Sequence, residues 1–150
     1  MKLVVQRVSK ASVIIDKKVV AYIGKGLLIL LGIEEADGQE DIEWLCGKLG
    51  RLRIFNDEND IMNLSIQDVD GDIIVVSQFT LHASTKKGNR PSYIKAAKPE
   101  TAIPLYKSFV KRLELELGKN IQTGEFGAMM DLEFINSGPV TIIIDSKNRQ

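Results

Sequence analysis

Cysteine, histidine and long apolar runs are nearly absent from this sequence. Its 150 residues hold one cysteine and one histidine, so no internal disulfide can form and no group of ligands has the spacing of a metal site. The longest apolar run, 27–31, is far shorter than the roughly 20 residues of a membrane-spanning helix. Residues 1–7 lack the long apolar core of a signal peptide. We therefore expect a cytoplasmic protein with no metal, no cofactor and no membrane partner.

Charge of one sign is not in excess either. The sequence has 20 Lys and Arg residues against 20 Asp and Glu residues, a formal net charge of zero. This balance excludes a uniformly basic coat for nucleic acid, although it leaves room for a local basic face. Apolar residues make up 44% and charged residues 27%, the composition of an ordinary globular protein. At this length we expect one domain, residues 1–150.

Apolar spacing predicts strands at both ends of the chain and in its middle. The run 26–33 is apolar almost throughout, which is typical of a strand buried on both faces. Partial alternation predicts strands on either side of a hairpin tip at Lys17-Lys18. The remaining strands are expected at 73–76, 129–135 and 140–145.

Two helices are predicted between these strands. Asp37 and Glu40 resemble a capping box, and apolar residues then recur at helical spacing as far as Leu52. A second helix ends before Gly118, a natural helix stop, and begins at one of three positions: Pro99, Ala102 or Pro104. Strands, a helix, strands, a helix and more strands indicate an α+β fold with a mostly antiparallel sheet or partial β-barrel and two main helices packed on it. A doubly wound parallel sheet is disfavoured because too few helices separate the strands.

The first motif that can carry chemistry is SQFTL at residues 77–81. If the preceding strand continues through it, Gln78, Thr80 and His82 share one face. Thr80 is then a candidate nucleophile with His82 as its base, although nothing supplies the orienting third group of a triad. The plainer alternative is a strand end with a polar face.

The second motif, NSGPVT at residues 136–141, contains the bond between Gly138 and Pro139. An ordinary trans turn is the plain expectation, because only about 5–6% of X-Pro bonds are cis in folded proteins. If this bond is cis, the motif is rigid and suits recognition by steric exclusion.

Two further segments have biased charge. Residues 83–98 contain five cations and no acid, which can attract phosphates or can simply form a solvated face: Lys86, Lys87, Arg90, Lys95 and Lys98. Residues 55–63 are acidic but lack the ligand spacing of a calcium loop, so we expect a solvated turn. Cys46 lies on an apolar helical stripe and is expected to be an inert core thiol.

At these motifs the chain resembles the D-aminoacyl-tRNA deacylases of the bacterial type. Residues 77–81 and 136–141 are similar to the two signatures of that family. Supporting similarities are spread in order along the chain, at residues 1–8, 87–92 and 123–130. Five ordered matches in 150 residues make coincidence an unsatisfactory explanation.

The resemblance implies a homodimer that hydrolyses the ester joining a D-amino acid to the terminal adenosine of tRNA, and that also acts on glycyl-tRNA, including glycine mischarged on tRNA(Ala). It implies that Gly138-Pro139 is cis and enters the partner's pocket, where its backbone excludes L-amino acids. The pocket is then formed by the catalytic-site residues Ser77, Gln78, Phe79 and Thr80, with Phe126 and Met129 on the substrate and adenosine side. Lys86, Lys87 and Arg90 become candidate contacts for tRNA phosphates.

The chemical step is left with two interpretations. Either the 2′-hydroxyl of the terminal ribose assists attack by water, which the resemblance favours, or Thr80 attacks and forms an acyl-enzyme. His82 occupies a position that is usually not histidine in the family, so no catalytic role is assigned to it. A nucleic-acid-binding module that keeps this fold without hydrolysis is the alternative to an enzyme.

Overall fold

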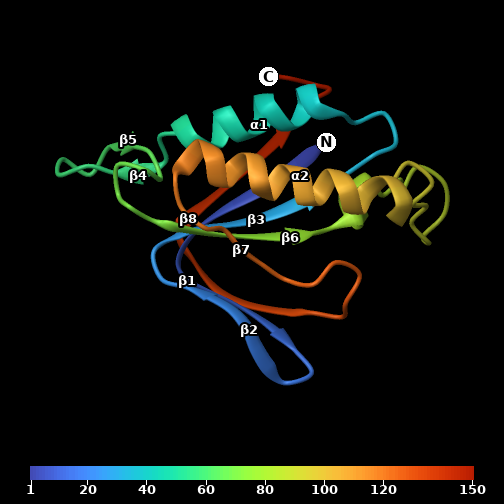
Figure 1. The fold of residues 1–150 in the computed structure, drawn as a ribbon, viewed down its shortest axis with the longest axis horizontal. Helices are drawn as coiled ribbons and strands as arrows, with labels where there is room; N and C mark the ends of the chain where they lie inside the picture. The colour runs from blue at the N-terminus through green and yellow to red at the C-terminus, as the bar shows by residue number, and fades with distance from the viewer.

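Six strands form one mixed sheet around β1 (Lys2–Ile15), the first strand of the chain. The computed structural model describes residues 1–150 and is drawn in Figure 1. β1 pairs antiparallel with three strands: β2 (Lys18–Ile23), β3 (Gly26–Gly32) and β8 (Asp131–Asp145). Beyond β3 the order continues in parallel through β6 (Asp72–Ser77) and β7 (Gln122–Thr123).

The sheet curls until β2 and β7 lie next to each other. No backbone ladder joins β2 to β7, but the Gln122 side chain of β7 bonds to the backbone of β2. The Gln122 Oε1 atom accepts a hydrogen bond from the Tyr22 N–H at 2.8 Å, and Gln122 Nε2 donates to the Tyr22 carbonyl at 2.7 Å. The sheet is therefore nearly closed into a barrel.

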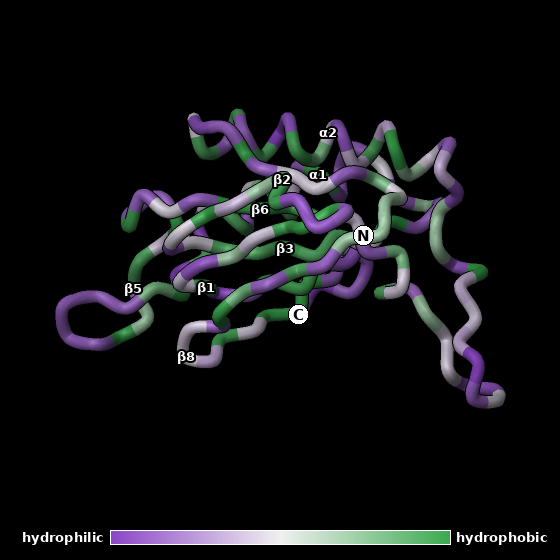
Figure 2. The backbone as a smooth tube through the Cα atoms, turned by 90° about the horizontal axis from the view of Figure 1, so that it is seen from below, coloured by the Kyte–Doolittle hydropathy of each residue, from purple (hydrophilic) through white to green (hydrophobic).

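The helices α1 (Gln39–Arg51) and α2 (Pro99–Leu117) lie on the same side of the sheet in both Figure 1 and Figure 2. β3 carries hydrophobic residues along its length in Figure 2 because its two faces meet two different cores. Leu27 and Ile29 belong to the core beneath the helices, whereas Leu28 belongs to the core inside the curled sheet. The predicted α+β fold, with two helices packed on a partial barrel, is confirmed.

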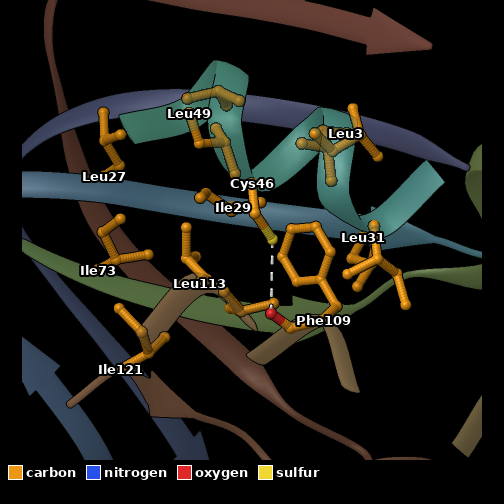
Figure 3. Packing of buried hydrophobic residues seen from close by; sticks show 14 of the residues in the cluster. Leu3, Leu27, Ile29, Leu31, Cys46, Leu49, Ile73, Phe109, Leu113 and Ile121 are labelled. Atoms are coloured by element: carbon orange, nitrogen blue, oxygen red, sulfur yellow. Dashed lines mark hydrogen bonds between the residues drawn. The ribbon is translucent and has the colours of Figure 1, made fainter. Parts of the chain in front are cut away.

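Cys46 lies in the core beneath the helices, as Figure 3 shows. Its Sγ atom is 3.6 Å from the carbonyl oxygen of Phe109, which connects α1 to α2. Burial raises the pKa of the Cys46 thiol to about 12. The thiol is therefore protonated and buried, as expected of a core residue.

The acidic segment 55–63 is a short hairpin, with strands β4 (Phe55–Asn56) and β5 (Met62–Leu64). Its turn is held by Asp57, whose Oδ1 accepts hydrogen bonds from the backbone N–H groups of Asn59 and Ile61. The first hairpin turns at Asp16 and Lys17, both with positive φ, one residue before the predicted tip.

The predicted capping box of the first helix is wrong. Gly38 is the N-cap of α1, and its N–H donates to the Asp41 carboxylate at 2.9 Å. Asp37 instead accepts from the Met1 amino group at 2.5 Å and from the Glu34 N–H at 2.8 Å. Asp37 is not the N-cap of α1 because it forms a buried ion pair with the Met1 amino group, 36 positions away. Local sequence patterns carry no signal for such a partner.

The second helix starts at Pro99, the earliest of the three predicted positions. Pro104 lies inside the helix, where it lacks an N–H for the preceding turn. At the start of the helix the Glu35 carboxylate accepts hydrogen bonds from the Lys98 N–H at 2.8 Å and from the Thr101 hydroxyl at 2.9 Å. These hydrogen bonds also lower the pKa of Glu35, the bond from Lys98 contributing most. Gly118 ends the helix in the left-handed conformation, as predicted.

The two C-terminal strands predicted from sequence are one long strand, β8, that contains the Gly138-Pro139 bond. Its pairing with β1 shifts register around Val8, which accommodates the irregular stretch between Asn136 and Thr141. No helix of the structure combines the length and the apolar character that a membrane crossing requires.

Candidate functional site

A pocket of about 380 Å³ opens where β6 ends, beside the first turn of α2. Five residues singled out from the sequence line it: Ser77, Gln78, Phe79, Phe126 and Met129. They come from two segments almost 50 positions apart, so the fold brings together what the sequence separated. The lining contains no Asp, Glu, Lys, Arg or His side chain. The pocket can therefore bind and orient a ligand, but it offers no side-chain general base.

Residues 77–82 do not continue as an extended strand. The prediction that Gln78, Thr80 and His82 share one face of a strand is therefore wrong. β6 ends at Ser77, and Phe79–His82 form a short 3₁₀ helix, η1. The turn packs tightly on Gly32, because a Cβ atom there would lie 2.9 Å from the Leu81 Cβ atom. The chain thus folds back over the end of β3.

Thr80 is joined to Gln78 within this turn. The Gln78 Nε2 atom donates to the Thr80 hydroxyl oxygen at 2.5 Å. Gln78 lines the pocket and Thr80 does not, so Thr80 holds the Gln78 amide without being part of the lining. The Thr80–His82 pair considered from the sequence does not form a hydrogen bond.

His82, the last residue of η1, is buried and does not line the pocket. Its Nδ1 atom lies 3.8 Å from the Glu34 carboxylate, and its Nε2 atom has no hydrogen-bond partner. No structural feature gives His82 contact with the pocket.

The opposite wall is made of small and aromatic side chains. Ala97, just before α2, and Ala102, in its first turn, line the pocket, and the Ala97 N–H donates to the Ile33 carbonyl at 2.9 Å. The Phe126 ring packs edge-on against Tyr106, with centroids 5.7 Å apart. The Tyr106 hydroxyl donates to the Val75 carbonyl, and burial raises its pKa to about 12. The aromatic wall is therefore fixed to β6.

Met129 stands at the mouth of the pocket and leaves 91% of its surface exposed. A flexible thioether side chain in such a place can adapt to a ligand that enters the pocket.

The second motif lies apart from the pocket of its own chain. Gly138 and Pro139 are exposed, joined by a cis bond, and absent from the pocket lining. Arg7 holds this stretch in place, because its Nε atom donates to the Ser137 carbonyl at 2.9 Å and its Nη1 atom to the Ile54 carbonyl at 2.8 Å. The two motifs are thus not brought together within one chain.

Side chains of β1 and β8 also hold residues 136–140 in place. Asn136 accepts from the Val140 N–H at 2.9 Å and donates to the Gln6 side chain at 2.6 Å. Thr141 completes the group by donating to the same Gln6 oxygen. The backbone between Asn136 and Val140 is consequently fixed at both ends.

The basic segment 83–98 projects beside the start of α2, where it is the olive loop of Figure 1. Its base is closed by reciprocal hydrogen bonds between the backbones of Ser84 and Ser92, at 2.8 and 2.9 Å. Lys86, Lys87 and Arg90 lie on the exposed arm above this base and take part in no ion pair. They are free to bind anions.

Sequence reasoning assigned no role to Arg7, to Glu35 or to Ala97 and Ala102. Their roles depend on partners more than 40 positions away, for which local patterns carry no signal. Tyr93, which lies in the basic segment 83–98, was given no role from the sequence. The structure places its ring 5.1 Å from that of Phe79, edge to face.

Comparison with known proteins gives consistent results. The family model described as D-Tyr-tRNA(Tyr) deacylase matches residues 4–145. The chain is 68% identical to the D-aminoacyl-tRNA deacylase of Flavobacterium johnsoniae and 63% identical to that of Bacteroides fragilis (strain YCH46), in both cases over 150 residues and the whole of both chains.

Two solved structures also match. One, named c-Myc DNA Unwinding Element Binding Protein, has a TM-score of 0.90 and 39% identity over 97% of this chain and 98% of its own. The other, described as a probable eukaryotic D-amino acid tRNA deacylase, has a TM-score of 0.81 over 95% of this chain and 97% of its own. At 18% identity the second likeness shows the fold alone.

Proposed function

Since this chain belongs to the D-Tyr-tRNA(Tyr) deacylase family, as its motifs predicted, we propose that it hydrolyses the ester of D-aminoacyl-tRNA in the cytoplasm. The products are free tRNA and the D-amino acid. The observation that carries the proposal is the pocket at the end of β6, which unites both segments of the predicted site and contains no acid or base. A site of this kind suits an activated ester, which needs positioning more than strong catalysis.

The site is completed across a homodimer, with Gly138 and Pro139 of one subunit entering the pocket of the other. Three features support this arrangement. Both residues are exposed and lie outside the pocket of their own chain, and the stretch that carries them is held by Arg7 and Asn136. The same strand exposes Ile135 and Ile143, which a partner would cover.

Steric exclusion explains how the proposed enzyme spares L-aminoacyl-tRNA. A soft pocket discriminates poorly, since one methylene is worth only about 1–3 kcal/mol. A backbone wedge discriminates better, because no rotamer change relieves a collision with it. Glycine carries no side chain to collide, so glycyl-tRNA, including glycine on tRNA(Ala), is also a substrate.

Hydrolysis proceeds by attack of water, assisted by the 2′-hydroxyl of the terminal ribose. Ser77 and Gln78 orient the ester, while Phe126 and Met129 contact the adenosine side. Phe79 and Thr80 open η1, where N–H groups lack intrahelical partners and can stabilise the developing oxyanion.

The role of Thr80 is tested by replacing it with valine, which has nearly the same shape. We expect the single-turnover rate constant for D-tyrosyl-tRNA to fall less than about tenfold, whereas loss of a true nucleophile costs on the order of 10⁴-fold or more. The measurement is single-turnover release of D-tyrosine. A correctly folded Thr80→Val protein without activity, or a covalent adduct trapped on Thr80 in the parent protein, would establish the acyl-enzyme instead.

The basic arm is tested by neutralising Lys86, Lys87 and Arg90 together. The slope of log affinity for tRNA against log salt should become shallower by about 2, because roughly three phosphate contacts are lost. A double substitution of Lys17 and Lys18, in the first hairpin, is the control and should leave the slope unchanged. An unaltered slope in the triple variant would place the tRNA elsewhere.

The proposed function itself is tested by release of D-tyrosine from D-tyrosyl-tRNA, with L-tyrosyl-tRNA as the control. We expect rapid release from the first and none above background from the second. The second candidate is a binding module without hydrolysis, favoured by one observation, the name of the solved relative that refers to a DNA unwinding element. Tight nucleic-acid binding with no release from either tRNA would support that candidate.

A further inference from the structure

Exposed apolar side chains stand at the mouth of the pocket, where Phe79 and Tyr93 form an aromatic pair that we call the lip. Phe79 and Met129, which line the pocket, are 56% and 91% exposed. Tyr93 lies just outside the lining, edge to face with Phe79, and is 40% exposed. The lip therefore continues the apolar wall of the pocket outward over the surface.

Tyr93 is held in a fixed position although it stands on a loop. Ser92, directly before it, forms the two backbone hydrogen bonds that close the base of the arm. The Tyr93 carbonyl accepts from the Ala96 N–H at 3.0 Å, in the turn that leads to α2. Since the backbone is fixed on both sides, little order needs to be gained when a ligand binds to the ring.

The aromatic pair leaves ring faces available. In an edge-to-face pair only one face of one ring is covered by its partner, and here the ring planes meet at 76°. A planar ligand can therefore stack on the lip. The arm with Lys86, Lys87 and Arg90 directly precedes Tyr93 in the chain, and its base at Ser92 adjoins the ring, so cations for a phosphate belong to the same loop.

We propose that Tyr93, supported by Phe79, is a stacking site for the base of the nucleotide that precedes the terminal adenosine of the substrate. The inference rests on the proposed function, which puts that adenosine in the pocket. Single-stranded RNA ends are recognised by stacking on exposed aromatic side chains, with cations nearby for the backbone. The chain of the RNA then leaves the pocket over Phe79, passes Tyr93 and reaches the cations of the arm.

The experiment compares Tyr93→Ala and Tyr93→Phe on two substrates, D-tyrosyl-tRNA and D-tyrosyl-adenosine. The second substrate lacks the preceding nucleotide. Tyr93→Ala should raise the KM for D-tyrosyl-tRNA about tenfold, equivalent to about 1.4 kcal/mol, with kcat unchanged. The same variant should leave the kinetics on D-tyrosyl-adenosine unchanged. Tyr93→Phe should behave like the parent protein on both, because the ring face is retained.

Tyr22→Ala is the matched control, since Tyr22 is also an exposed tyrosine but lies on β2, outside the pocket lining. Equal losses of Tyr93→Ala on both substrates would show that Tyr93 only supports Phe79, and no loss on either would show that no base stacks there. Both results overturn the inference. If the parent protein hydrolyses neither substrate, the proposed function is wrong and the inference falls with it. If the parent protein is active and Tyr93→Ala loses equally on both substrates or on neither, only the inference is wrong.

Discussion

Replacing Gly138 with alanine is expected to lower kcat/KM for D-tyrosyl-tRNA by about 100-fold, the usual cost of misplacing a site by about 1 Å. Gly138 has a φ of +129°, which L side chains rarely adopt. A Cβ atom there would lie 2.8 Å from the Arg7 Nη2 atom and 2.9 Å from the Val140 Cγ2 atom. The added methyl group would push away the side chain that holds the Ser137 carbonyl, and the proposed wedge would move with it.

The measurement is steady-state hydrolysis of D-tyrosyl-tRNA and glycyl-tRNA, together with the melting temperature. Gly118→Ala is the control, since Gly118 also has a positive φ but its Cβ would meet nothing within 4 Å. This control carries the cost of backbone strain without any change near the site. If Gly138→Ala has parent-like kinetics on both substrates, the wedge model is wrong.

Gly26→Ala should have the largest effect on stability of any single methyl group added to the sheet. A Cβ atom on Gly26 would lie 1.8 Å from the Asp72 carbonyl oxygen and 2.8 Å from its carbon, both backbone atoms that cannot rotate away. Gly26 and Asp72 are the first pair of the β3–β6 ladder. We expect the free energy of unfolding to fall by about 3 kcal/mol or more, because the start of this ladder must separate.

Urea and thermal unfolding measure this change, and a loss of that size should lower Tm by roughly 10 °C. Gly24→Ala is a control two positions earlier, where an added Cβ meets nothing within 4 Å. Its unfolding free energy should stay within about 1 kcal/mol of the parent value. Equal stability of the two variants would contradict the close approach of β3 and β6.

Much of the fold follows from local patterns in the sequence. The apolar run at β3 predicted a strand buried on both faces, and the structure assigns Leu27 and Leu28 to opposite cores. Gly118 marked the end of α2 correctly because the left-handed position there is a local requirement. Such features need only neighbours in sequence, so one sequence suffices to find them.

Features that depend on distant partners were missed or mispredicted. Residues 79–82 fold into η1, and Gly32 lets this turn lie close to the end of β3, a contact across more than 40 positions. Asp37 leaves the cap of α1 for the Met1 amino group, and Glu35 caps a helix that begins more than 60 positions later. Nothing in the local sequence marks these partners.

The candidate site was predictable only where short local motifs mark its residues. Residues 77–79 and the segment with Phe126 and Met129 were assigned from motifs, and the pocket contains both. The sequence could not show that Thr80 binds the Gln78 amide and stays outside the pocket lining, since both depend on the 3₁₀ turn. Whether Gly138 and Pro139 reach the pocket of a second subunit stays a prediction.

The side-chain link between β2 and β7 has a consequence for how the protein behaves in a crowded solution. Gln122 occupies the N–H and the carbonyl of Tyr22, the groups by which another extended chain would add to this edge. The same edge exposes Val19, Val20 and Tyr22, which would favour such addition. The Gln122 side chain therefore hinders the addition of another extended chain at Tyr22, where β2 and β7 are joined without a backbone ladder.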